Sequence, residues 1–298
     1  MALLAVTPLL IPVCLHSADL PAARISVDSS LVLVPVRVTD AIGAPIVGLN
    51  KENFQVYEDN VEQTVTHFSL EDAPISVGVL FDSSGSMRNK MRQSADAVKA
   101  FLHSANPADE FFLVEFSERP KLAVPFTGDA GEILQQVSHT RPFGRTSLLD
   151  AIQVALKQMK SAQNRRKAIV ILSDGGDNRS RFTRGAIREA VLESDVQLYA
   201  IGIFADVEAG KLTPEERGGP QLLSTLADDS GGRLYTVSSL DELAAVGSRI
   251  GDDLRTQYLL GYASSNTVRD GKYRHIKLKV TSPDLRANYR QGYFQPSQ

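Results

Sequence analysis

The middle of the chain alternates short apolar runs with stretches whose apolar residues recur at helical spacing. Residues 75–81 form an apolar run, and behind it Met91, Ala95, Val98 and Leu102 share one helical face. Further helices are expected at 146–159 and near 240–254, and further strands at 111–116, 121–126 (an antiparallel edge), 168–172, 196–203 and 233–237. Strands that alternate with helices predict an α/β fold, a doubly wound and mostly parallel sheet with helices on both faces.

Both ends of the chain show the alternation of half-buried strands instead. Valines at every second position from 32 to 38 predict one strand, and later candidates are 54–57, 61–68, 257–262, 276–280 and 288–294. Each end is too short to bury a core alone, so we expect them to pair into one small β-sheet module. The predicted organisation is a signal-like segment at 1–23, the module's two parts at 28–70 and 256–295, and the α/β domain at 74–254. The polar stretch 204–221 is interpreted as a surface loop.

Small oxygen-bearing side chains stand where three of these apolar elements give way to loops. Asp82, Ser84 and Ser86 follow the run 75–81, Thr146 opens a helix, and Asp174 follows the run 168–172. The loops at the carboxyl ends of parallel strands converge on one crevice. Two carboxylates and three hydroxyls in that crevice would form an oxygen-ligand site for a hard cation such as Mg²⁺.

The pattern Asp82-x-Ser84-x-Ser86, then Thr146, then Asp174 resembles the metal-ion-dependent adhesion site (MIDAS) of the von Willebrand factor type A domain, and the resemblance covers residues 75–250. It implies Mg²⁺, with Mn²⁺ able to substitute, held directly by the three hydroxyls. The two carboxylates would act through water or orient the hydroxyls. One coordination position would stay open for an Asp or Glu of a protein partner, which makes the predicted function metal-dependent protein binding or adhesion.

The ends of the chain also resemble the acidobacterial von Willebrand A-related subfamily, at residues 36–40, 48–49, 54–59 and 257–262. Asn60 stands where a glycine is usual in that subfamily, and Asn tolerates the left-handed turn expected there. The resemblance implies the same pairing of the two ends.

Other readings of these residues stay open. Each Asp, Ser or Thr of the site alone is explained as a helix cap or turn former, and Asp177 as a solvated turn residue. A metal-independent scaffold that binds through the β module is one alternative. A phosphatase-like hydrolase with Asp82 as nucleophile is another, although Ser84 stands where that chemistry wants a second acid. The sequence lacks a Gly-x-Ser-x-Gly elbow and a Walker motif, so we expect no enzyme.

Composition and the first residues limit the expected partners and the cellular location. A net charge of −3 without a Lys or Arg block argues against nucleic-acid binding, and the single Cys14 allows no disulfide within the chain. The apolar run 2–15 is shorter than the roughly 20 residues of a membrane-spanning helix. It is typical of a secretion signal, with cleavage expected near Ala18 or Ala22, while lipidation of Cys14 is an alternative. We therefore expect an extracytoplasmic protein, secreted or periplasmic.

Overall fold

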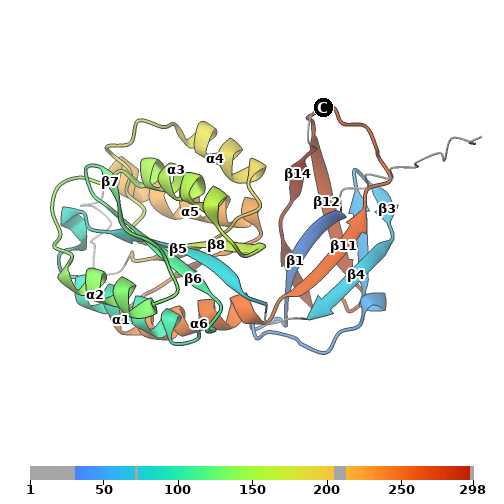
Figure 1. Cartoon of the computed structure of the whole chain (residues 1–298), viewed down its shortest axis with the longest axis horizontal. Coiled ribbons are helices and arrows are strands. Elements are labelled where there is room, and N and C mark those ends of the chain that lie inside the picture. Colours follow the sequence, from blue (N-terminus) through green and yellow to red (C-terminus); the bar gives the residue numbers. More distant parts are fainter. Residues whose placement is uncertain (1–30, 71–72, 205–212, 296–298) are drawn as a thin grey trace, which may run out of the picture.

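The computed structural model describes residues 31–70, 73–204 and 213–295 (Figure 1). The expected signal-like segment 1–23 and Cys14 lie outside these residues. Within the described part of the chain, no helix is long and apolar enough to cross a membrane. Figure 1 shows an α/β unit beside a β module formed by the first and last strands of the chain.

A six-stranded sheet forms the centre of the α/β unit. Its strands run in the order β10-β9-β8-β5-β6-β7, and all neighbours are parallel except β7, which pairs antiparallel with β6 at the edge. The strands are β5 (Ile75–Asp82), β6 (Glu110–Phe116), β7 (Pro120–Thr127), β8 (Arg166–Ser173), β9 (Gln197–Gly202) and β10 (Arg233–Thr236). This confirms the predicted doubly wound, mostly parallel sheet and its antiparallel edge strand.

Helices cover both faces of this sheet and bury one apolar cluster on each. On one face, alternate residues of β5 such as Val77 and Val79 pack with the helix residues Val98 and Ile250. The opposite cluster joins β6, β8 and β9 to the three other helices. The helices are α1 (Met91–Leu102), α2 (Ala130–His139), α3 (Leu148–Gln158), α4 (Arg184–Glu193), α5 (Pro214–Ser230) and α6 (Leu243–Arg255). Successive side chains of each strand point to opposite faces, so the strands contribute to two separate cores.

The β module consists of two four-stranded sheets, where the sequence predicted one. Their orders are β13-β1-β11-β4 and β14-β12-β2-β3. Val34 and Leu260 from the first sheet and Val56 and Leu278 from the second share one buried cluster. The strands are β1 (Leu31–Thr39), β2 (Phe54–Glu58), β3 (Val61–Gln63), β4 (Val65–Leu70), β11 (Tyr258–Ala263), β12 (Tyr273–Val280), β13 (Arg286–Tyr289) and β14 (Gly292–Phe294). Segments 61–68 and 288–294, each predicted as one strand, are both split between the two sheets.

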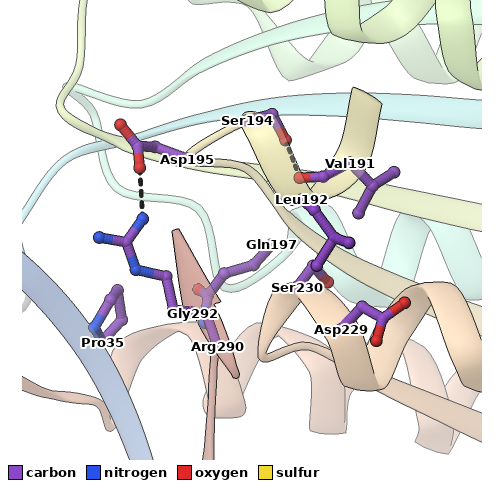
Figure 2. A pocket seen from close by; sticks show the side chains of 10 residues that line it. All are labelled: Pro35, Val191, Leu192, Ser194, Asp195, Gln197, Asp229, Ser230, Arg290 and Gly292. Carbon is purple, nitrogen blue, oxygen red and sulfur yellow. Dashed lines mark hydrogen bonds and ion pairs between the residues drawn. The ribbon is translucent and has the colours of Figure 1, made fainter. Parts of the chain in front are cut away.

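The module contacts the α/β unit through pairs of charged side chains. Arg37 on β1 places its Nε 2.6 Å from Oδ1 of Asp253 on α6, and both side chains are buried. Arg290 beside β14 pairs with Asp195, and Figure 2 shows this contact from close by. The cavity drawn there has a volume of about 30 Å³, which admits little more than water. The two units therefore meet closely along this line.

The interpretation of 204–221 as a loop is wrong from residue 214 onward, where α5 begins. Thr213 caps α5: its hydroxyl accepts a hydrogen bond from Glu216 N at 3.3 Å, and Glu216 Oε2 accepts one from Thr213 N at 2.8 Å. Pro214 takes the first helical position, where a missing N–H costs nothing. The capping box starts the helix despite the Gly- and Pro-rich composition of its first turns.

Candidate functional site

The predicted site lies at the carboxyl ends of two neighbouring parallel strands. Asp82 is the last residue of β5 and Ser173 the last of β8, and the two strands pair directly. Ser173 Oγ donates a hydrogen bond of 2.5 Å to Asp82 Oδ2 across this pair. The chain goes from β5 to one side of the sheet, to β6 and β7, and returns on the other side at β8. This reversal of strand order is the place where open α/β sheets bind ligands.

The first loop brings two of the predicted hydroxyls together. Asp82 Oδ1 accepts a hydrogen bond of 2.9 Å from Ser84 N, which closes a tight turn directly after the strand. A short 3₁₀ turn at Gly85–Met87 follows, and it places Ser84 Oγ 3.0 Å from Ser86 Oγ. Ser84 is buried and Ser86 is exposed, so this pair of oxygens reaches from the sheet edge to the surface.

Backbone hydrogen bonds attach the segment before Thr146 to this first loop. Phe143 N donates to Ser83 O at 2.9 Å, and Gly85 N donates to Gly144 O at 3.0 Å. Gly144 has φ of +69°, a conformation that favours glycine, and a Cβ there would come within 2.6 Å of a neighbouring glutamate side chain. Thr146 therefore follows a loop whose position relative to the serines is fixed by main-chain contacts.

The loop after Asp174 holds Thr146 from the other side. Asn178 Oδ1 accepts a hydrogen bond of 3.0 Å from Thr146 N, and Thr146 O accepts hydrogen bonds from the N–H groups of Asn178 and Arg179 at 3.1 and 3.0 Å. The Thr146 hydroxyl makes no hydrogen bond to the residues that the structure describes. The structure therefore ties the three predicted segments together and leaves this hydroxyl available to a ligand.

Two glycines allow the Asp174 loop to lie against α5. Gly175 has φ of +76°, and an added Cβ would come within 2.9 Å of the Gly219 backbone. A Cβ on Gly219 would in turn lie 2.7 Å from the backbone of Gly175. Real Cβ atoms do not approach backbone this closely, so the contact requires glycine on both sides. No local pattern in 204–221 indicates this contact, because it depends on two segments that are distant in the sequence.

The electrostatics of the site favour a bound cation. Burial and, secondly, the nearby charge of Asp174 raise the pKa of Asp82 to about 7, against the hydrogen bonds from Ser173 and Ser84. Lys90 supplies one positive charge: its Nζ lies 3.5 Å from Asp174 Oδ2, and both side chains are buried. Two close carboxylates with a single ammonium leave a net negative charge, which a divalent cation would offset.

Three residues that the sequence analysis did not single out help to build the site. Ser173 orients Asp82, Asn178 holds Thr146, and Lys90 pairs with Asp174. Ser173 and Asn178 border the Asp174 motif, so their position was the only available signal. Lys90 gave no signal, because a lysine at the start of a helix is ordinarily exposed.

Asp177 is not the solvated turn residue that the sequence analysis expected. Its Oδ1 accepts a hydrogen bond of 2.5 Å from Ser180 Oγ and a longer one of 3.5 Å from Leu149 N, in the first turn of α3. Burial raises its pKa. Asp177 therefore accepts a hydrogen bond from the first turn of α3, as a capping residue would. The Thr146 hydroxyl, which was one candidate for this cap, is not used for it.

The donor set suits a hard cation better than a metal that prefers thiolate or imidazole ligands. It offers two carboxylates and three hydroxyls, and oxygen ligands of this kind are typical of Mg²⁺ and Mn²⁺. Among the described residues no group of three or more His, Cys, Asp and Glu is arranged to hold a metal. A site here would therefore depend on the hydroxyls of Ser84, Ser86 and Thr146 as much as on the carboxylates.

Comparison with known proteins identifies a domain in the middle of the chain. Residues 77–176 match the sequence model of the von Willebrand factor type A domain. The chain is 24% identical over 230 residues to an uncharacterized protein of Borreliella burgdorferi, which covers 72% of this chain and 61% of that protein. It is 25% identical over 192 residues to inter-alpha-trypsin inhibitor heavy chain H4 of Homo sapiens, which covers 59% of this chain and 20% of that protein. The chain spans less than two thirds of the length of either relative.

Solved structures share the fold. A von Willebrand factor type A protein from Catenulispora acidiphila matches with a TM-score of 0.52 and 13% identity, over 88% of this chain and 72% of that one. Proximal thread matrix protein 1 of the mussel byssus, with a zinc-occupied MIDAS motif, matches with a TM-score of 0.54 and 17% identity, over 67% of this chain and 50% of that one. The match over residues 77–176 and the shared fold identify a von Willebrand factor type A domain within this chain.

Proposed function

We propose that the protein is a metal-dependent protein-binding module. Mg²⁺, or Mn²⁺ in its place, would be held directly by the hydroxyls of Ser84, Ser86 and Thr146. Asp82 and Asp174 would act through bound water and by orienting the hydroxyls. An Asp or Glu of a protein partner would complete the coordination shell. When bound, the metal would supply an electrophilic position for that carboxylate.

One observation carries this proposal: hydrogen bonds join all three segments at the switch point of the sheet. Asp82 is bonded to Ser173 beside Asp174, the serine loop is bonded to the segment before Thr146, and Thr146 is bonded to the loop after Asp174. Independent caps or turns would not need these mutual contacts. The zinc-occupied motif of the mussel protein supports a divalent cation in this fold.

The surface around the site supports a protein partner. Phe143, which is hydrogen-bonded through its N–H to the serine loop, is 60% exposed, and Phe182 in the loop that packs on α3 is 45% exposed. Exposed aromatic residues are enriched in protein interfaces. Domains of this family act generally in adhesion and protein interaction rather than catalysis. We therefore place the partner's acidic residue at the metal and an apolar contact beside it.

Metal titration tests the proposal. Isothermal calorimetry with MgCl₂ and MnCl₂ should show one site, and metal at 100-fold above its dissociation constant should stabilise the fold by about 2.7 kcal/mol. Thr146→Ala should weaken binding and melt near wild type in chelator, because the Thr146 hydroxyl makes no hydrogen bond to the described residues. An unchanged melting temperature at millimolar metal in wild type would refute the proposal.

Asp174→Asn tests the metal site less specifically than Thr146→Ala does. The substitution should weaken metal binding, because it removes one of the two carboxylates of the site. The structure places the ammonium of Lys90 3.5 Å from Asp174, with both groups buried. Replacing the carboxylate leaves that ammonium without its ion-pair partner, which destabilises the fold itself. We therefore expect Asp174→Asn, unlike Thr146→Ala, to melt below wild type even in chelator.

A second candidate is metal-independent binding through the β module, and one observation favours it. Ile42, Val47, Val61 and Val268 all lie in the module and are 90%, 56%, 55% and 58% exposed. Affinity capture from an envelope extract in Mg²⁺ and in excess chelator separates the two functions, since only the first is lost in chelator. The signal-like segment supports an extracytoplasmic location for either function.

A further inference from the structure

Lys90 is a buried lysine at an unfavourable place. It stands at the N-cap position of α1, where its backbone N–H donates to Met87 O at 2.8 Å. A positive charge at a helix N-terminus is disfavoured by the helix dipole, and a buried ammonium is costly without a partner. Its Nζ lies 3.5 Å from Asp174 Oδ2 and donates a hydrogen bond of 3.1 Å to Ile203 O. These two contacts compensate for its position.

The hydrogen bond that holds the Lys90 ammonium is connected to the hydrogen bonds that hold the site. Ile203 follows β9, and its N–H donates to Ser173 O at 3.0 Å, while Ser173 orients Asp82. The ammonium is therefore held from the side of the sheet by a carbonyl that a metal ion would not displace. It is placed to remain beside Asp174 whether or not the site is filled.

We propose that Lys90 is a built-in counter-charge that sets the affinity of the site for divalent cations and the strength with which the bound cation attracts an external carboxylate. This inference rests on the proposed metal site. With Asp82 and Asp174 ionised, Lys90 reduces the charge of the site from −2 to −1. A divalent cation then leaves a net charge of +1. Without Lys90 the metal would be bound more tightly but would be neutralised by the protein.

Lys90→Gln tests this role, because it removes the charge and keeps a polar N–H donor, one bond shorter than the ammonium. Lys90→Met is a second variant that keeps the unbranched apolar part of the side chain and removes the ammonium. Lys99→Met is the matched control, since Lys99 is exposed on the same helix and its loss changes the net charge equally. Mn²⁺ affinity is measured by calorimetry and by water-proton relaxation, and folding by melting in chelator. Binding of free acetate to the Mn²⁺-loaded protein is followed by the same relaxation signal.

We expect Lys90→Gln to bind Mn²⁺ at least about tenfold more tightly than wild type and to respond less to acetate, since one unit charge at short range is worth more than a tenfold effect. Lys99→Met should match wild type. If wild type binds Mn²⁺ and both Lys90 variants bind it equally or more weakly, the inference is overturned while the metal site stands. If neither wild type nor any variant binds metal, the proposed function and the inference fail together.

Discussion

The ion pair between Arg37 and Asp253 gives the most quantitative prediction, because it links the two units of the molecule. Arg37 lies on β1 of the β module and Asp253 on α6 of the α/β unit, and the two are 4% and 1% exposed. The Tyr235 hydroxyl also donates to Asp253. We choose Arg37→Met, which retains an aliphatic side chain and removes the guanidinium.

The expected loss of stability in Arg37→Met follows from the pKa of Asp253. Burial raises this pKa from 3.8 to about 6, even with the opposing charges of Arg37 and Arg233. A folded pKa above the unfolded value means that the contribution of Asp253 is fully present below about pH 4 and is lost as the pH rises through 6. Without Arg37 the buried carboxyl stays protonated in the folded state, and each pH unit above 6 then costs about 1.4 kcal/mol. Arg37→Met should therefore cost about 3 kcal/mol at pH 8, near the lower end for a broken buried pair.

At pH 5 the same substitution should cost little beyond its packing, because Asp253 is protonated in both proteins. Urea unfolding at pH 5 and pH 8 measures the difference, followed by circular dichroism because the chain contains no Trp. The exposed Arg92→Met on α1 is the control and should be neutral at both values. An equal cost at the two pH values, or a cost below 1 kcal/mol at pH 8, would refute the reasoning.

Three other predictions follow from packing and pairing. Gly219→Ala should loosen the metal-site loop and lower both the stability of the fold and the affinity for Mn²⁺. Gly185→Ala in α4, where an added Cβ meets nothing within 4 Å, should instead stabilise the fold by up to about 1 kcal/mol. Thermal melts and calorimetry compare the two variants. Truncation after Leu254 removes β11, which lies between β1 and β4, so hydrogen exchange should show loss of protection in both strands. Tyr293→Phe removes a 2.9 Å hydrogen bond to the buried carboxylate of Glu58 and should cost about 1.5–3 kcal/mol in urea unfolding.

The strands of the central sheet were predictable because their burial on both faces leaves near-continuous apolar runs. The run 75–81 becomes β5, every residue of which is buried. The β module was less accessible to sequence reasoning. Alternation continues from Val61 through Val65, yet β3 pairs with β2 in one sheet and β4 with β11 in the other. A period of two gives the face of a strand and not its partner, so the split depends on contacts between distant residues.

The candidate site was likewise predictable only in part. Asp82, Ser84, Ser86, Thr146 and Asp174 were predicted because their types and order follow a motif. The structure places Asp82 at the end of β5, the two serines and Asp174 after strand ends and Thr146 in the loop before α3, and their role as a site stays a prediction. Their supports required the fold, since neither the contact between Gly175 and Gly219 nor the ion pair of Lys90 has a local signature. The assignment to the acidobacterial subfamily and the direct metal ligands stay predictions.

The position of the β module explains how the two proposed binding surfaces can be told apart. The module connects to the amino end of β5 and to the end of α6, and its β13 and β14 side contacts Asp195 and Gly232, which precede β9 and β10. All of these lie at the amino ends of the parallel strands, whereas the site residues Asp82 and Asp174 lie at the carboxyl ends. Figure 1 shows the module at one end of the α/β unit. An eight-residue strand such as β5 spans about 26 Å, so a partner can reach the metal-site edge without touching the module. Loss of binding in Thr146→Ala therefore reports on the metal-site edge alone.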